Sequence, residues 1–466
     1  MPESPGLMTI ASNGTSTHAW ALKISLLCLL AVVPASAQDQ RAVDNWPMWR
    51  GPLGTGAAPH ADPPVEWNED TNVRWKTPLP GLGHSSPVVW GDRIFLTTAI
   101  PVGDALPPRH SRAPGAHDNL PVTHKQQFVA LAVNRGDGSI AWQQPLHEEL
   151  PHEGWHETAS AASHSPVTDG RHIIASFGSY GLYCLDVEGN EIWRKQLGKM
   201  QIKHGHGEAS TPALFGDTVI VNWDQETGSF IVAFDKETGH EKWRKPRDEE
   251  TSWSSPIVIE HDGQPQVVVS GTNRIRSYEL QTGRVLWECG GLSSNIVASP
   301  VYDDGMVFAG SSYETRSLLA IRLDDASGDL TGTAHVAWSR NQRTPYVPSP
   351  LLYDGALYFL YHYQGVLSRV AAKTGDEPTG PFRLPEITDV YSSPVAAAGR
   401  VYVTDRDGTT LVIASQENPR ALARNQLDDQ FSASAALVGS ELFLRGKKSL
   451  YCLAEETPVA GESREE

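Results

Sequence analysis

The sequence of 466 residues predicts an all-β fold, an eight-bladed β-propeller of four-stranded antiparallel blades. Two recurring phrases predict it. The first is Ser-Pro, a short apolar strand, a Gly or Asp turn and a second apolar strand. The second is an apolar strand, a tight turn and a strand with a Trp, as in IVAFDKETGHEKW from Ile231 to Trp243. Repeats of roughly 40 to 45 residues with this content are typical of propeller blades.

The first phrase supplies strands A and B of each unit, and the second supplies strands C and D. A proline at the start of strand A is tolerated there because it removes no required hydrogen bond of the ladder. Turns rich in Asp and Gly fit tight hairpins. An eighth copy has Ala435 in the place of proline. The other seven units begin at Pro87, Pro166, Pro212, Pro256, Pro300, Pro350 and Pro394.

A Trp recurs in strand D because a single four-stranded sheet cannot bury both of its faces. Radial packing covers each blade with its neighbour, and a large apolar ring fills the interface. Units six and seven have segments 382–384 and 423–425 in this place. The repeated tryptophans are Trp75, Trp142, Trp193, Trp243, Trp287 and Trp338.

The last unit has too few strands at its C-terminal end, because an acidic tail follows residues 450–453. The segment 72–76 resembles strand D of the second unit, 192–195. We therefore predict that this N-terminal strand completes blade eight and closes the ring, which removes the exposed sheet edges.

The first 37 residues predict an export signal. Lys23 precedes an apolar run over 24–33, and Ala35 and Ala37 supply a small-residue cleavage site. A buried helix is the alternative for this run, and translation can start at Met1 or Met8. We divide the chain into a signal peptide (1–37), a Pro/Gly/Trp-rich extension (38–70), a propeller (71–454) and an acidic disordered tail (455–466). We expect a periplasmic or extracellular protein with no transmembrane segment after cleavage.

Charge and cysteine content narrow the function classes. The formal net charge of −17 argues against nucleic acid and anionic membranes as partners. Removing the leader leaves Cys184, Cys289 and Cys452, an odd number that gives no disulfide framework. We expect these cysteines to be small buried residues.

The two phrases resemble the pyrroloquinoline-quinone-like propeller repeat, most clearly over Asp235–Trp243. The segment 46–52, WPMWRGP, resembles the N-terminal lead of exported bacterial propellers of this type. The resemblance implies one of two functions. One branch of the family consists of periplasmic dehydrogenases that use the quinone and calcium. The other is non-enzymatic and includes the BamB-like propeller subunit of outer-membrane β-barrel assembly, and we favour this branch.

The dehydrogenase branch often carries two adjacent cysteines, and this sequence has neither that pair nor a C-x-x-C-H segment. Pyrroloquinoline quinone with calcium needs a carboxylate, an amide and a base Asp. Glu208, Asn222, Asp224 and Asn295 are available, but they form no matching motif, and the alternative is that they are loop polar residues. We therefore favour a protein without catalysis or a cofactor and keep the quinone enzyme as the alternative.

Ten of the 17 histidines fall on one predicted face, in the loops of blades one to three. Spacings of the type H-x-x-x-H and H-x-H-x-E can hold a transition metal. The alternative is that these long loops are simply solvated, because no tight multi-ligand signature is present. The candidate metal ligands are His152, His156, His204, His206 and Glu208.

Loops on a rigid scaffold commonly carry function. We therefore predict a binding or scaffold protein with a protein or peptide partner and with the loops of blades one to three as its working face. Some aromatic candidates are instead expected to be packing residues. The further candidates for this face are His84, His110, His164, Tyr180, Trp223, Tyr313 and Tyr361.

Overall fold

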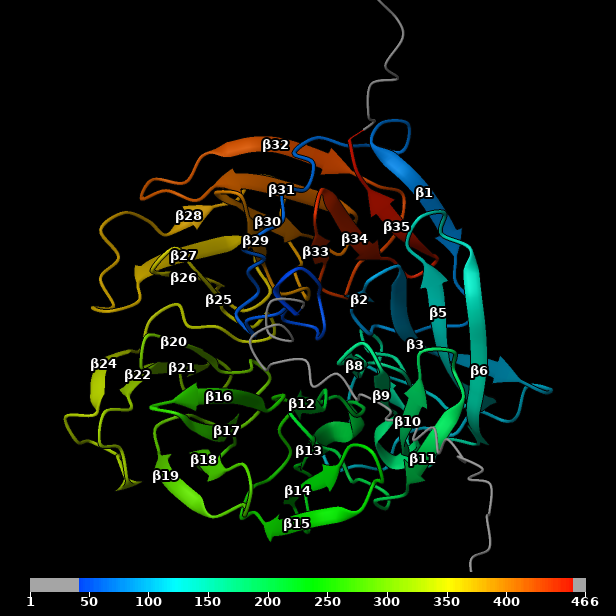
Figure 1. Cartoon of the computed structure of the whole chain (residues 1–466), viewed down its shortest axis with the longest axis horizontal. Helices are drawn as coiled ribbons and strands as arrows, with labels where there is room; N and C mark the ends of the chain where they lie inside the picture. Colours follow the sequence, from blue (N-terminus) through cyan, green and yellow to red (C-terminus); the bar gives the residue numbers. More distant parts are fainter. Residues whose placement is uncertain (1–41, 456–466) are drawn as a thin grey trace, which may run out of the picture.

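The computed structural model describes residues 42–455 and confirms the predicted eight-bladed propeller (Figure 1). Eight antiparallel sheets surround a central channel, each with its strand A innermost. The predicted signal peptide and residues 456–466 of the predicted tail lie outside the described residues. Among residues 42–455, no helix is long and apolar enough to cross a membrane.

The first four blades follow the order A to D from the channel outward, and the fourth has an additional parallel strand, β23 (Gly328–Asp329). Their strands are β2 (Val88–Trp90), β3 (Arg93–Val102), β5 (Lys125–Asn134) and β6 (Ile140–Glu149); β8 (Val167–Thr168), β9 (His172–Ser176), β10 (Leu182–Asp186) and β11 (Glu191–Lys195); β12 (Ala213–Phe215), β13 (Thr218–Trp223), β14 (Phe230–Asp235) and β15 (Glu241–Pro246); and β16 (Ile257–His261), β17 (Gln264–Ser270), β18 (Ile275–Glu279) and β19 (Val285–Cys289).

The last four blades follow the same order. Their strands are β20 (Val301–Asp303), β21 (Met306–Ser311), β22 (Ser317–Arg322) and β24 (Val336–Arg340); β25 (Leu351–Tyr353), β26 (Ala356–Leu360), β27 (Val366–Ala371) and β28 (Phe382–Arg383); β29 (Val395–Ala397), β30 (Arg400–Thr404), β31 (Thr409–Ala414) and β32 (Ala421–Gln426); and β33 (Ala436–Val438), β34 (Glu441–Arg445), β35 (Ser449–Leu453) and β1 (Val73–Pro78). Two short 3-10 helices lie in loops, η1 (Gly178–Tyr180) and η2 (Lys203–Gly205).

The N-terminal strand closes the ring as predicted. β1 pairs antiparallel with β35, with Trp75 opposite Cys452. Arg445 adds a second link between the last and first blades, because its Nη1 donates to the carbonyl of Thr97 at 2.7 Å. The ends of the chain are therefore joined by non-covalent contacts, and blade eight has no exposed edge at this seam.

The repeated Trp packs each blade onto the next. The Nε1–H of Trp193 donates to the carbonyl of Lys236 in blade three at 2.7 Å. Its ring lies against Gly239, where a Cβ would come within 2.7 Å of the indole. Gly239 also has a φ of +67°, so the Thr-Gly turn serves both the hairpin and the interface. Trp75, Trp142, Trp243 and Trp338 contact Gly138, Gly189, Gly283 and Gly375 of the following blades in the same way.

Trp287 departs from this pattern. It is 1% exposed, and its Nε1 donates to Oε1 of Gln266 in its own blade at 3.2 Å. Blade five has a longer connection here in place of the short Thr-Gly turn, and β23 within it pairs with β19. The insertion covers Trp287 with an additional strand.

A closed ring of hydrogen bonds surrounds the channel. In each blade, the backbone N–H of the residue two positions before strand A donates to the side-chain hydroxyl of the equivalent residue in the next blade, at 2.8–3.1 Å. The last of these bonds runs from blade eight back to blade one. The residues are Ser86, Ser165, Thr211, Ser255, Ser299, Ser349, Ser393 and Ser434. The Ser-Pro repeat is therefore the sequence signature of this ring.

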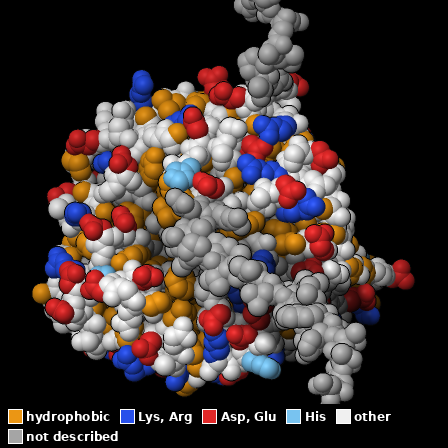
Figure 2. Space-filling model, in the orientation of Figure 1, with side chains coloured by type: hydrophobic (Ala, Val, Ile, Leu, Met, Phe, Trp, Pro, Cys, Tyr) orange, Lys and Arg blue, Asp and Glu red, His pale blue; other side chains and the backbone are white. Residues whose placement is uncertain are grey.

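The segment before β1 crosses one end of the channel (blue, Figure 1). Trp46 pairs with Val89 of β2, and Ala57 pairs with Ala396 of β29. Between them, the buried guanidinium of Arg50 donates to the carbonyls of Pro394 and Pro350 at 3.0 and 2.8 Å. On the face shown in Figure 2, acidic and basic side chains are interspersed around the rim.

Deleting residues through Lys76 removes most of β1 and should prevent stable folding, because it leaves β35 unpaired. The milder substitution Trp75→Ala should lower the free energy of unfolding by about 3 kcal/mol, since it empties the contact with Gly138. Trp75→Phe is the control, with a smaller loss. Urea denaturation measures all three, and a truncated protein as stable as the intact chain would contradict the closure.

Candidate functional site

The channel widens at one end into a cavity of about 760 Å³. The eight serine and threonine residues of the hydrogen-bond ring around the channel line the inner part of this cavity. Trp49 of the N-terminal segment also lines it. The B–C and D–A loops form its mouth, and these are the connections that the sequence placed together on one face. The cavity is therefore covered at one end and lined by loop side chains at the other.

A cluster of four histidines forms one wall of the mouth. The ring centres of His117 and His206 are 4.6 Å apart, those of His156 and His206 are 4.8 Å apart, and those of His204 and His206 are 5.3 Å apart. Burial is the main cause that lowers the pKa of His206 to about 4, followed by the charges of the neighbouring histidines. Most of the His206 population is therefore neutral at pH 7.

Short local structures bring these histidines together from three loops. A long insertion joins β3 and β5 of blade one (residues 103–124). β4 (Asn119–Leu120) in this insertion pairs with β7 (Trp155–His156) in the loop that follows β6. Asn119 Nδ2 donates to the carbonyl of His204 at 2.7 Å. Gly205 has a φ of +65°, and a Cβ there would lie 2.2 Å from Ser111 Oγ. The segment 203–207 (KHGHG) can therefore approach the insertion closely only because residue 205 is a glycine.

Stacked aromatic side chains from blades five to seven form the other wall. Tyr313 stacks on Tyr346 at 5.7 Å, and Tyr363 stacks on Tyr391 at 5.8 Å. His362 contacts Tyr346 edge-on at 5.4 Å. Tyr313 and Tyr363 are 47% and 40% exposed, so large apolar rings face solvent at the rim.

His152 and Glu208 lie in a separate small pocket beside this cavity. Both ring nitrogens of His152 are engaged, with Tyr180 Oη at 2.9 Å and the carbonyl of Met200 at 2.8 Å. Glu208 Oε2 accepts from the N–H of Ser179 at 2.6 Å, and burial raises the pKa of Glu208 to about 7. The predicted metal ligands are thus divided, because His156, His204 and His206 line the large cavity.

The other predicted binding residues have different environments. His84 lines the cavity, and burial is the main cause that lowers its pKa to about 3. Tyr180 and His164 are 6% and 5% exposed and line the small pocket. Trp223 is 3% exposed and stacks on Phe230, so it is a packing residue. His110 is exposed in the insertion, and Tyr361 contacts His362 edge-on at 4.5 Å.

Several cavity residues were not among the sequence-based candidates for binding. They are His117, Tyr346, His362, Tyr391 and Arg406. His117 lies in the insertion of blade one, two residues before the short strand β4, and no periodic pattern in the sequence indicated this strand. The tyrosines belong to loops of blades five to seven, outside the predicted working face.

A second hollow of about 800 Å³ lies over blades seven and eight. Its lining includes Asp429, whose carboxylate accepts backbone N–H groups of Lys448 and Ser449 at 3.1 and 3.0 Å. This carboxylate fixes a tight turn. The channel mouth, with its unpaired histidine nitrogen and exposed tyrosines, is the stronger candidate site.

The family described as outer membrane protein assembly factor BamB matches residues 125–377 and 228–457, together more than half of the sequence. The chain belongs to this family. The structure of BamB from Moraxella catarrhalis is 15% identical, with 77% of this chain and 99% of that chain covered and a TM-score of 0.49. The comparison with curated proteins gives no match.

One quinoprotein enzyme shares the fold of this BamB-family chain. The quinohemoprotein alcohol dehydrogenase from Pseudomonas putida is 11% identical, with 91% of this chain and 83% of that chain covered and a TM-score of 0.53. The enzyme from Comamonas testosteroni is 13% identical, with 92% and 84% covered and a TM-score of 0.48. At 11% identity, the likeness to the Pseudomonas putida enzyme shows the fold alone.

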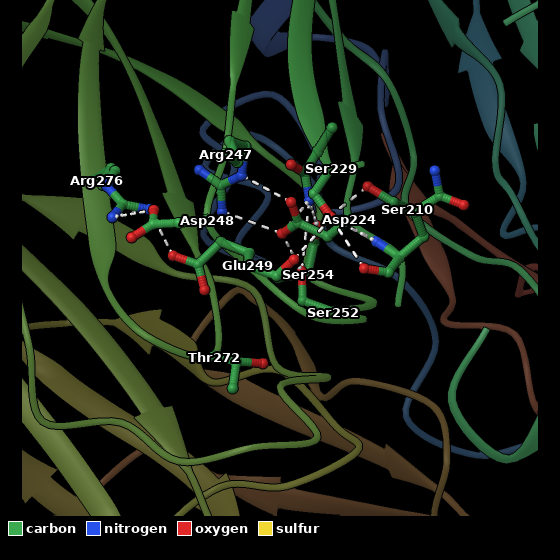
Figure 3. Close-up of polar contacts among 12 residues, drawn as sticks. Ser210, Asp224, Ser229, Arg247, Asp248, Glu249, Ser252, Ser254, Thr272 and Arg276 are labelled. Atoms are coloured by element: carbon green, nitrogen blue, oxygen red, sulfur yellow. Dashed lines mark hydrogen bonds and ion pairs between the residues drawn. The ribbon is translucent and has the colours of Figure 1, made fainter. Parts of the chain in front are cut away.

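One of the two carboxylates that the sequence offered for a calcium-bound quinone, Asp224, is already paired within the fold. Asp224 and Arg247 have fully buried side chains and form a bidentate pair at 2.7 and 3.0 Å (Figure 3). Asp224 also accepts from Ser252 Oγ at 2.7 Å and Asn222 Nδ2 at 3.1 Å. The charge and the acceptor sites of Asp224 are thus used within the fold, so Asp224 is not free to bind calcium.

The cysteines of this BamB-family chain are structural. Cys184, Cys289 and Cys452 are buried and not in disulfides. Burial raises the pKa of the Cys184 thiol to about 12 and that of Cys289 to about 11. These thiols are protonated at neutral pH and are therefore poor nucleophiles.

Asp224→Asn should lower the free energy of unfolding by about 3–5 kcal/mol, because it leaves the Arg247 charge buried without its partner. The matched control is Glu241→Gln. Its pair with Arg244 has side chains that are 42% and 36% exposed, so the loss should stay below about 1 kcal/mol. Urea denaturation compares the two variants. Equal, small losses would show that the buried pair is not needed for stability.

His164 should make the protein less stable in acid. Burial lowers the pKa of His164 to about 4, below its ordinary value of 6.5, so the unfolded chain binds the proton first. Its stabilising contribution is complete above pH 6.5 and is lost as the pH falls towards 4, with about 2 kcal/mol lost at pH 5. His164→Gln should therefore show a smaller difference in melting temperature between pH 7.5 and 5 than the native chain. The exposed His110→Gln should leave that difference unchanged, and an equal effect of both would refute the assignment.

Proposed function

We propose that this protein is an exported, non-enzymatic scaffold that binds a protein or peptide segment at the channel mouth. The observation that carries the proposal is a cavity covered at one end and open between a histidine wall and a tyrosine wall. The loops of blades one to three form the working face, and the tyrosines of blades five to seven face them. Membership in a family described as an outer membrane assembly factor supports the same role.

The tyrosine wall suits a peptide segment. Tyrosines present large, rigid surfaces with a polar tip, and they lose little conformational entropy on binding. Stacking holds Tyr313 and Tyr363 against Tyr346 and Tyr391 while leaving the first two exposed. Such a surface is ready for contact without rearrangement.

The charge of the lining favours a neutral or basic segment. Asp118, Glu157 and Asp389 line the cavity. Among the described lining residues, Arg406 is the one Arg or Lys, and its Nη1 pairs with Asp389 at 2.6 Å. An acidic segment would therefore meet like charge, which disfavours binding.

A quinone-dependent dehydrogenase is the runner-up. Its support is the shared fold, and fold alone does not establish chemistry. The occupied Asp224 carboxylate argues against it.

A photo-crosslinking residue in place of Tyr313 tests the scaffold role in cells that export the protein. We expect a defined crosslinked partner, reduced several-fold by Tyr363→Ala or Tyr391→Ala. The control position is His240, which is exposed in the turn after β14 on the opposite face and should give no such product.

Equal crosslinking from both positions, unaffected by the tyrosine substitutions, would refute a role for the channel mouth. Saturable thermal stabilisation of the purified protein by pyrroloquinoline quinone with calcium would instead support the dehydrogenase.

A further inference from the structure

Three histidines of the cluster form a triangle of the size that a metal ion requires. The ring centres of His117 and His204 are 5.2 Å apart. The ring centre of His206 lies 4.6 Å from that of His117 and 5.3 Å from that of His204. Zn–N distances of about 2.0–2.1 Å and tetrahedral angles place the ring centres of two ligating imidazoles about 5 Å apart. The observed spacing therefore matches three imidazoles around one ion.

The hydrogen bonds of two of these rings leave their Nε2 atoms available. Nδ1 of His117 lies 2.8 Å from the carbonyl of Gly115, and Nδ1 of His204 lies 3.2 Å from that of Pro114. A carbonyl only accepts, so each Nδ1 carries the hydrogen and each Nε2 has the lone pair. Backbone carbonyls orient metal-ligating histidines in this way.

The third ring has an unsatisfied atom. Nε2 of His206 is buried, and the described residues give it no hydrogen-bond partner. A buried polar atom without a partner is costly in a folded protein, and a bound ion is one of the explanations for it.

Hydrogen bonding separates these three histidines from their neighbours. The N–H of Thr158 donates to Nδ1 of His156 at 3.2 Å, so the hydrogen of that neutral ring is on Nε2. His152 has both ring nitrogens engaged by Tyr180 and Met200. Their hydrogen bonds therefore leave neither His156 nor His152 with a free nitrogen lone pair. In His117 and His204, the bond at Nδ1 leaves the lone pair of Nε2 free.

We propose that His117, His204 and His206 form a three-histidine site for a divalent transition metal ion, with Zn²⁺ as the best fit. Imidazole is a preferred ligand of Zn²⁺, and three protein ligands leave a fourth position for water or another ligand. All three residues line the cavity, so this position faces the channel mouth. The metal site does not depend on the scaffold role. If a protein segment binds at the mouth, one of its side chains could occupy the fourth position on the metal.

Metal binding requires the three rings to tilt. As the side chains stand, no group of three His, Cys, Asp or Glu residues within 42–455 is placed to hold a metal ion. The χ2 torsion of histidine is broad, so the ring orientation adjusts at low cost.

Calorimetric titration with ZnCl₂ tests the site in the mature chain without a histidine tag. We expect one Zn²⁺ per chain and a visible absorption band of tetrahedral type when Co²⁺ replaces Zn²⁺. His117→Ala, His204→Ala and His206→Ala should each weaken binding by at least ~100-fold, because even outer partners of metal ligands contribute 10–100-fold. His110→Ala, in the same insertion as His117, should leave the affinity unchanged.

Circular dichroism establishes that each variant is folded, so that a loss of metal is not a loss of structure. The proposal is overturned if the native chain binds no Zn²⁺ or if binding survives all three substitutions. It is also overturned if His152→Ala abolishes binding in a folded protein while the three variants retain it. That result would assign the metal to the pocket of His152 and Glu208.

Discussion

The closed ring of hydrogen bonds around the channel is the constraint on which the rest of the structure depends. Each bond joins the backbone of one blade to a hydroxyl of the next, so the ring fixes the spacing of all eight innermost strands. Proline follows seven of the eight residues and favours an extended backbone before it. Losing one hydroxyl would leave a buried N–H unsatisfied, which costs about 1–3 kcal/mol.

Two further sets of contacts hold the blades in place. Tryptophan–glycine contacts join neighbouring blades farther from the channel, and the N-terminal segment links blades across one end of the channel. Each docked indole needs a glycine in the neighbouring turn, because a Cβ would occupy the place of the ring. β1 joins the two ends of the chain, and the segment around Arg50 covers one end of the channel. The symmetric ring thereby becomes a cavity that is covered at one end and open at the other.

The distribution of polar side chains separates structural roles from binding roles. Asp224 and Arg247 satisfy each other in the interior, and the cysteines are buried and protonated, so these groups stabilise the fold. The histidines and tyrosines of the mouth are held by loops on a rigid scaffold, with exposed rings and an unpaired nitrogen. Side chains presented in this way are suited to binding.

The sequence alone determined the fold, the number of blades and the closing strand, because strands, turns and docking tryptophans are local patterns that repeat. It also placed the histidine loops at one end of the ring, where His117, His156, His204 and His206 line the cavity. Only the tertiary structure decided which histidines meet. His152 and His156 have a spacing that aligns side chains on a helix, but β7 (Trp155–His156) is extended, and the two rings lie in different pockets. His117 joins His206 through the β4–β7 pair and the backbone at Gly205, which are contacts between loops that no periodic pattern encodes.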